Sequence, residues 1–138
     1  LCQANAEQEL ALKEYGHHLG IAFQLVDDVL DYEGDAATMG KNVGDDLAEG
    51  KATLPLIHAM REGTEAQAKL IRTAIRKGGL EDIDAILEIV KTCGSLDYTK
   101  QIARKHVELA QECLNHLDDS DAKQALLGLA RIAIERNT

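Results

Sequence analysis

Apolar residues recur along most of the chain at steps of three and four positions, which is the period of an α-helix. The first such run predicts one long helix from Asn5 to Tyr32. The stretch from Glu33 to Lys51 follows, with four glycines and little apolar periodicity, and indicates a loop with a short helical turn over residues 45–48. Connections of this length in a compact domain are usually functional or disordered. The two lysines in this one favour a functional role.

Start and stop signals divide the rest of the chain into further helices. Thr53 and Pro55 favour a helix start, because threonine can cap free backbone amides and proline tolerates the first turn. Thr64, with Gln67 three residues later, forms a capping-box pattern. Glycines supply the stops. The predicted helices cover residues 54–61, 64 to the glycines at 78 and 79, 81–93, 96–117 with Ser95 as cap, and a last one that Asp119 or Ser120 caps and that ends near Arg136.

Composition supports an all-α fold. Aromatic residues make up 3% of the chain and there is one proline, while Val, Ile, Leu and Ala fill the periodic runs, which disfavours a β-rich structure. The 138 residues, 45% of them hydrophobic, are enough for one globular domain with its own core. No internal repeat, low-complexity tract or linker divides the sequence. We therefore predict a single all-helical segment over residues 1–138.

Charge and cysteine content exclude several classes of partner and site. The formal net charge of -9 disfavours a nucleic-acid partner, which needs clustered Lys and Arg. The three cysteines are widely spaced without a CxxC pair, so the sequence predicts neither a disulfide framework nor a zinc site, and free thiols suit the cytoplasm. The apolar runs are too short for a transmembrane segment or a signal peptide. We expect a cytoplasmic protein.

Three aspartates, Asp27, Asp28 and Asp31, lie within the first predicted helix, and Gln24 precedes them by one turn. At about 100° per residue, these four positions fall within an arc of roughly 100°, and apolar residues cover most of the remaining circumference. A helix that is apolar nearly all round is normally buried, so we expect the carboxylates to face an internal cavity. Clustered buried carboxylates repel one another and are costly to desolvate. A bound divalent cation of the magnesium class, which prefers oxygen ligands, would resolve this conflict.

The loop after this helix offers groups that suit diphosphate oxygens. Lys41 and Lys51 are compact point charges, and the glycines near them allow the backbone to approach a ligand. A DDxxD string alone is common on solvated helix faces, and a Gly-Lys pair alone often ends a helix. The two motifs in this order are more specific than either motif alone. Carboxylates, a metal ion and lysines together predict a diphosphate site.

The motif order resembles the second aspartate-rich region of the trans-isoprenyl (polyprenyl) diphosphate synthases. The residues that carry the resemblance are FQLVDDVLD at 23–31, Gly-Lys at 40–41, GDDL at 44–47, Gly-Lys at 50–51 and TLP at 53–55. The similarity extends through GSL at 94–96 to the last helix, and is closest to the long-chain bacterial members, the octaprenyl diphosphate synthases. It implies an isoprenoid-synthase-type helical bundle, of which this chain is the C-terminal half.

The resemblance also implies a chemistry and residue roles. The family uses Mg²⁺ to condense isopentenyl diphosphate onto an allylic, farnesyl-type diphosphate with loss of pyrophosphate. The resemblance further implies a homodimer and a long product that serves quinone side chains. The implied roles are metal binding by Asp27, Asp28 and Asp31 with help from Asp45, allylic diphosphate binding by Lys41 and Lys51, and a border to the isopentenyl group formed by Phe23 and Gln24.

Other family elements are missing from these 138 residues: the first aspartate-rich motif, the arginines after it and an earlier Gly-Lys-Arg element. The acidic run at 118–121 does not reproduce the missing motif. We therefore expect a C-terminal portion of a longer synthase that is inactive alone.

Two other functions stay open. A non-catalytic helical subunit of a prenyltransferase would have no physical reason to keep a costly acid stripe. A terpene cyclase shares aspartate and magnesium chemistry but offers no reason for the loop from Lys41 to Lys51. The five histidines form no metal set in the sequence and indicate structural or surface roles, and Cys93 and Cys113 lie at apolar helix positions typical of small core residues.

Overall fold

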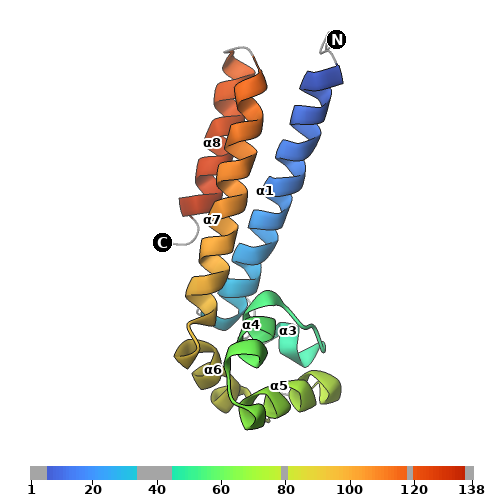
Figure 1. The fold of residues 1–138 in the computed structure, drawn as a ribbon, viewed down its shortest axis with the longest axis vertical. Helices are drawn as coiled ribbons and strands as arrows, with labels where there is room; N and C mark the ends of the chain where they lie inside the picture. The colour runs from blue at the N-terminus through green and yellow to red at the C-terminus, as the bar shows by residue number, and fades with distance from the viewer. Residues whose placement is uncertain (1–5, 34–44, 79–80, 118–119, 136–138) are drawn as a thin grey trace. The chain divides into compact units, whose positions relative to one another are not determined.

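The computed structural model describes residues 6–33, 45–78, 81–117 and 120–135, and every regular element in these ranges is a helix (Figure 1). The all-α prediction is confirmed. None of the helices in this part of the chain combines the length and hydrophobicity needed to span a membrane. The helices are α1 (Ala6–Glu33), α3 (Asp45–Ala48), α4 (Leu54–Glu62), α5 (Glu65–Lys77), α6 (Ile83–Thr92), α7 (Ser95–Cys113), the 3₁₀ turn η1 (Leu114–His116) and α8 (Asp121–Glu135).

Two of the predicted helix starts are confirmed in detail. The hydroxyl of Thr64 accepts a hydrogen bond of 3.2 Å from the backbone N–H of Gln67, and the Gln67 side-chain oxygen accepts one of 2.9 Å from the Thr64 N–H. This capping box opens α5, which Gly78 closes with a left-handed φ of 65°. The Ser120 hydroxyl likewise accepts a hydrogen bond of 3.1 Å from the N–H of Lys123 at the start of α8.

Helix α4 begins at Leu54 as predicted, with Thr53 at the N-cap position, but two predicted caps make no capping hydrogen bond through their side chains. Thr53 precedes α4 but makes no side-chain capping bond. One of the two amides that a cap can reach belongs to Pro55, which has no N–H to donate. Ser95 is the first residue inside α7, where its hydroxyl pairs with a buried histidine instead. Helix α6 also begins two residues later than predicted, at Ile83.

The contacts divide the chain into two compact units, Leu1–Val26 with Gln101–Thr138, and Asp27–Lys100. We call them unit 1 and unit 2 and describe each by itself. Helices α1 and α7 each contribute to both units. The organisation of residues 1–138 as a single segment stays a prediction.

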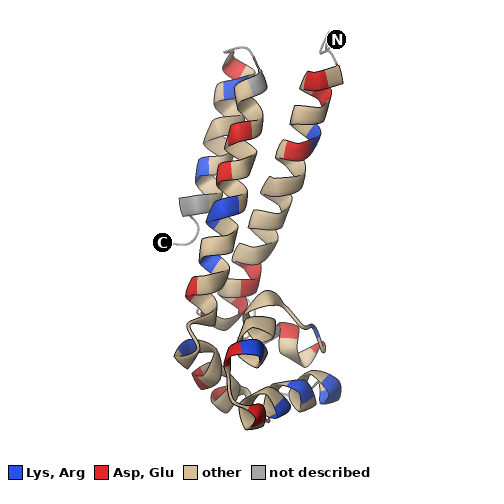
Figure 2. Ribbon diagram, viewed as in Figure 1, with Lys and Arg blue, Asp and Glu red and all other residues tan. Residues whose placement is uncertain are grey.

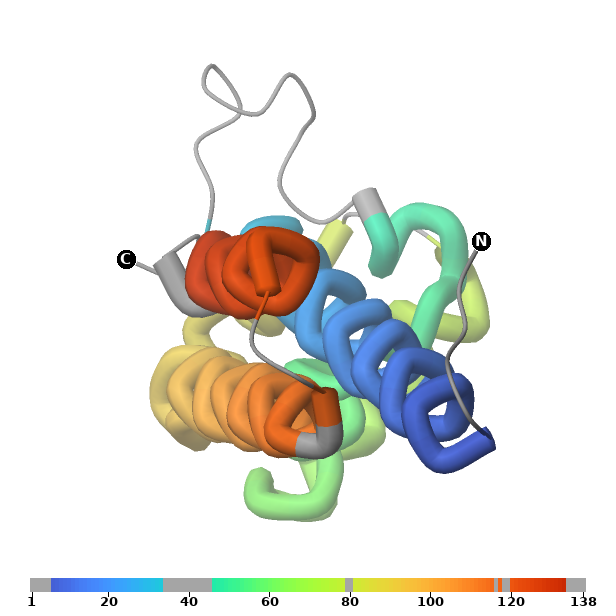
Figure 3. The backbone as a smooth tube through the Cα atoms, turned by 90° about the horizontal axis from the view of Figure 1, so that it is seen from above, coloured from blue at the N-terminus to red at the C-terminus, as the bar shows by residue number. Residues whose placement is uncertain are grey.

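In unit 1, residues 6–26 of α1 pack with the later part of α7, with η1 and with α8. Figures 1 and 3 show α7 and α8 side by side. The Tyr15 hydroxyl donates a hydrogen bond of 2.7 Å to the backbone oxygen of Leu126. Leu10 continues the apolar period of α1 but is 56% exposed. The core residues are Tyr15, Leu19, Ala22, Val107, Ala110, Leu114, Ala130 and Ala133.

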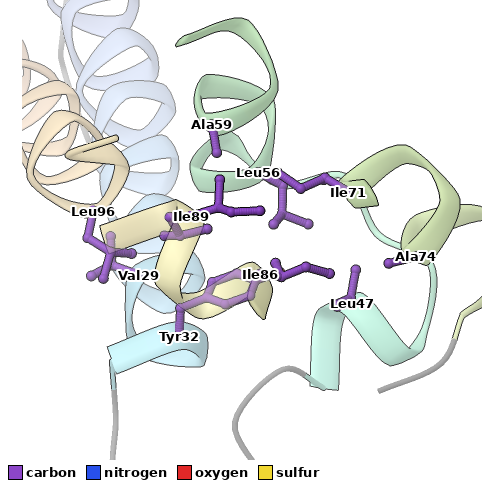
Figure 4. Close-up of a cluster of buried hydrophobic side chains, with 11 residues drawn as sticks. Val29, Tyr32, Leu47, Leu56, Ala59, Ile71, Ala74, Ile86, Ile89 and Leu96 are labelled. Carbon is purple, nitrogen blue, oxygen red and sulfur yellow. The ribbon is translucent and has the colours of Figure 1, made fainter. Parts of the chain in front are cut away.

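Unit 2 has a core to which six helices contribute (Figure 4). Its fully buried members include Leu47 of α3, Leu56 of α4 and Ile71 of α5. Helix α3 lies so close to the end of α5 that a Cβ at Gly78 would come within 3.0 Å of the Ala48 oxygen. This packing fixes α3, the short helix that reaches the acidic end of α1. The core residues are Val29, Tyr32, Leu47, Leu56, Ala59, Ile71, Ala74, Ile86, Ile89, Val90 and Leu96.

Candidate diphosphate and metal site

The last two turns of α1 place the three aspartates in different environments. Asp31 is 1% exposed and Asp28 is 6% exposed, whereas Asp27 is exposed. The expectation that all three carboxylates face an internal cavity is therefore wrong for Asp27. An arc of about 100° is wide enough to cross from the buried face of a helix to its solvent face. The stripe thus presents both buried and accessible carboxylates along one side of α1.

Asp46 connects this stripe to α3. Its backbone N–H donates a hydrogen bond of 3.2 Å to Oδ2 of Asp31. The side chain of Asp46 is 15% exposed, so its own carboxylate is partly accessible to solvent. Asp46 was not among the predicted site residues, although it is the second acid of the GDDL motif at 44–47.

Lys51 joins the same cluster through Asp46. Its ammonium nitrogen lies 3.8 Å from Oδ1 of Asp46 and 2.9 Å from Oε2 of Glu49. Its backbone N–H donates a hydrogen bond of 2.8 Å to the backbone oxygen of Asp46. The hydrogen bond and charge of Glu49, followed by the charge of Asp46, raise the pKa of Lys51. Because the Lys51 side chain is 58% exposed, these pairs are weak and the ammonium group can exchange partners.

Tyr32 lies directly after the acidic stretch and is a second residue that the sequence did not single out. It is 2% exposed. Burial first, and then the negative charge of Asp31, raise the pKa of its phenol, with smaller contributions from Asp46 and Asp28. The phenol therefore stays protonated at neutral pH beside the carboxylates. A tyrosine at an apolar position next to a charged motif is the one sequence signal that could have identified it.

Of the other predicted residues, Lys41 lies outside the described residues, and so does the side chain of Asp45. The predicted helical turn that carries Asp45 is confirmed as α3. Phe23 and Gln24 precede the aspartates on α1. Phe23 packs against the core of unit 1, and Gln24 is exposed. Among the residues predicted for the site, the structure therefore brings together Asp31 and Lys51, and Asp46 connects them.

The donor chemistry fits a magnesium-class ion. Within the described ranges, no group of three or more His, Cys, Asp or Glu residues could hold a metal ion without other ligands. Magnesium does not require such a group, because it keeps several waters and is usually held by one or two carboxylates together with substrate phosphates. Asp27 and Asp31 are four residues apart on α1 and supply hard oxygen donors one helical turn from each other. An accessible carboxylate beside a buried one suits an ion that also binds a ligand from solvent.

Comparison with known proteins assigns the family. Residues 1–93 match the family model described as Polyprenyl synthetase. The octaprenyl diphosphate synthase of Escherichia coli (strain K12) is 49% identical over 138 residues, which are 99% of this chain and 43% of that protein.

Solved structures support the same family assignment. A polyprenyl synthase from Caulobacter crescentus CB15, complexed with calcium and isoprenyl diphosphate, superposes with a TM-score of 0.86 at 39% identity, over 98% of this chain and 42% of that one. A geranylgeranyl pyrophosphate synthase from Corynebacterium glutamicum, complexed with isoprenyl diphosphate and magnesium, gives a TM-score of 0.79 at 37% identity, over 96% and 39%. The chain spans less than half the length of these relatives. It belongs to the polyprenyl synthetase family.

Proposed function

We propose that this chain forms part of a magnesium-dependent polyprenyl diphosphate synthase, which condenses isopentenyl diphosphate onto an allylic, farnesyl-type diphosphate and releases pyrophosphate. The observation that carries the proposal is the link from the buried Asp31 carboxylate through Asp46 to the ammonium group of Lys51. This link supports the proposal, because it joins a buried carboxylate, which could hold a metal ion, to an accessible ammonium group, which could bind a diphosphate. The names of the relatives support the same reaction.

Each residue has a defined task in this proposal. Asp27 and Asp31, with Asp28 and Asp45 at the same site, hold Mg²⁺, which when bound supplies positive charge to the departing diphosphate. Lys51, together with Lys41, leaves its exposed pairs and binds the diphosphate oxygens, so that their developing negative charge is stabilised. Asp46 fixes the Asp31 carboxylate through its backbone N–H. Phe23 and Gln24 border the isopentenyl group. No side chain acts as a nucleophile.

The finer properties of the enzyme rest on similarity. We propose a long, octaprenyl-like product that serves quinone side chains, and a homodimeric, cytoplasmic synthase. Support comes from the octaprenyl diphosphate synthase at 49% identity, and for the metal from the relative solved with magnesium. A non-catalytic helical subunit of a prenyltransferase is the alternative, which the acid stripe and Lys51 disfavour.

The test is incorporation of labelled isopentenyl diphosphate by the complete synthase that contains this chain, with farnesyl diphosphate as the acceptor and product length resolved by chromatography. We expect elongation that requires magnesium and stops when a chelator removes it. The 138-residue chain alone should give no turnover. If the folded complete protein incorporates nothing at any magnesium concentration, the non-catalytic subunit becomes the better assignment.

A further inference from the structure

Unit 2 contains a hollow of about 470 Å³ between the end of α4 and one face of α5, away from the residues of the proposed active site. Its size falls in the usual range for small-molecule sites. Figure 2 shows that Lys and Arg recur along α5. The charged residues that line the hollow are Arg61, Glu65, Lys69 and Arg72.

The lining is positive in a strongly acidic protein. Three cations and one carboxylate give the hollow a formal charge of +2, whereas the whole chain carries -9. Lys69 and Arg72 form no ion pair with any other residue that the structure describes. Glu65 is the one acidic side chain in the lining, and Arg61 pairs with Glu62 at 3.4 Å, so the excess positive charge of the hollow lies on Lys69 and Arg72. Such a local excess of cations attracts a multiply charged anion.

Arg61 is held in place at the rim of this hollow. Its guanidinium carbon lies 5.5 Å from the ring centroid of Tyr98, which stacks on the ring of His58 at 4.2 Å with an angle of 21° between the planes. His58 is itself buried and shares a hydrogen bond of 2.8 Å with the hydroxyl of the buried Ser95. The guanidinium group thus rests on a chain of contacts that reaches the core. Positioning an arginine before a ligand arrives lowers the entropic cost of binding.

At the start of α5, the capping box already engages the backbone N–H groups of Thr64 and Gln67. We therefore base recognition on the side chains that line the hollow. Two arginines can bind phosphate oxygens with two parallel hydrogen bonds each, and a lysine adds a point charge.

We propose that the hollow lined by Arg61, Lys69 and Arg72 binds a small phosphate-type polyanion of the diphosphate class, at a second site independent of Asp31 and Lys51. A membrane surface fits less well, because the cations surround a concavity rather than a broad face. Diphosphate is also the anion that the proposed reaction would release. The binding itself does not depend on that reaction.

The test is a titration of the ¹⁵N-labelled protein with inorganic pyrophosphate, at low ionic strength and with a chelator present so that no magnesium contributes. We expect the backbone signals of Thr64, Lys69 and Arg72 to move together. Lys69→Gln or Arg72→Gln should each weaken binding about two- to fivefold, and the double variant about tenfold. Arg76→Gln is the matched control, because Arg76 carries the same charge on α5 but does not line the hollow.

Three further variants test whether pyrophosphate binds at this hollow and whether binding depends on Arg61. Lys51→Gln, which alters the proposed active site, should leave these shifts unchanged. Tyr98→Leu should weaken binding by releasing Arg61, whereas Tyr98→Phe keeps the aromatic ring and should bind like the unmodified protein.

The proposal is overturned if pyrophosphate moves no signals around the hollow, or if Lys69→Gln and Arg72→Gln bind as tightly as Arg76→Gln. It is also overturned if the protein sediments with phosphatidylglycerol vesicles and does not bind pyrophosphate, since the cations around the hollow would then contact a membrane surface.

Discussion

The backbone N–H of Asp46 donates a hydrogen bond of 3.2 Å to Oδ2 of Asp31, and so ties helix α3 to the acidic end of α1. Hydrogen bonds to charged groups contribute about 1.5–3 kcal/mol, more than neutral ones. The side-chain oxygen Oδ1 of Asp46 lies 3.8 Å from the ammonium nitrogen of Lys51. The geometry of the candidate site in unit 2 therefore depends on where α3 packs.

Removal of the accessible carboxylate should separate catalysis from folding. In the complete synthase, Asp27→Ala should reduce magnesium-dependent condensation by about 100-fold or more, because charge on the leaving diphosphate loses its stabilisation. Helical content, measured by circular dichroism, should not change, since Asp27 is exposed. Asp27→Glu keeps the charge and should retain part of the activity. Glu9→Ala removes another exposed acid of α1 and serves as the control; unchanged turnover in Asp27→Ala would contradict the assigned role.

The close approach of α3 and α5 should make Gly78 sensitive to substitution. Gly78→Ala places a side chain at a φ of 65° and only 3.0 Å from the Ala48 oxygen, so we expect a loss of about 1–2 kcal/mol in the free energy of unfolding. Gly128→Ala makes the same chemical change within α8, where the new group would meet no atom within 4 Å apart from its chain neighbours and the nearby backbone of its own helix. It should stabilise the protein by about 0.5–1 kcal/mol. Urea denaturation measures both, and equal effects would contradict the described packing.

The core of unit 2 should respond strongly to a cavity. Ile71 is fully buried, and Ile71→Ala should lower the free energy of unfolding by about 2–5 kcal/mol. Ile57→Ala removes the same atoms from a side chain that is 45% exposed, and should change stability by less than about 0.5 kcal/mol. Chemical denaturation of the two variants in parallel gives the comparison. A similar cost at both positions would mean that α4 and α5 are packed differently.

Histidine pairing in unit 1 should make stability depend on pH. Nδ1 of His18 lies 3.0 Å from Nδ1 of His106, a separation that accommodates one proton between them. Burial first, then the charges of His18, His17 and Lys105, lower the pKa of His106 below its usual 6.5. The folded state therefore binds fewer protons than the unfolded state as pH falls below 6.5, so stability is fully present above that pH and declines below it.

Urea midpoints between pH 7.5 and 5.5 measure this dependence, in a window above the titration of most carboxylates. His106→Gln should flatten the slope, whereas His17→Gln, at an exposed position, should alter it less. A slope that His106→Gln leaves unchanged would assign the dependence to other groups.

Local patterns predicted the helices well. The capping box at Thr64, the stop at Gly78 and the short turn at 45–48 all appear where the sequence placed them, because helix period, caps and glycine stops depend on residues within one or two turns. The same locality explains the errors. Thr53 and Ser95 both have suitable side chains for capping. Pro55 removes one of the two amides that Thr53 could cap, and the hydroxyl of Ser95 pairs with a histidine 37 positions away.

By itself, the sequence determined the all-α class and the acidic stripe at 27–31, and it predicted a diphosphate-binding role for Lys51. Only the tertiary structure decided that Asp31 is buried while Asp27 is exposed, that Asp46 links Asp31 to Lys51, and that Tyr98 and His58 support Arg61 beside a basic hollow. Each of these relationships requires the position of a partner on another helix or the coverage of a helix face. A periodic pattern shows which residues share a face of one helix, whereas long-range packing determines what that face meets.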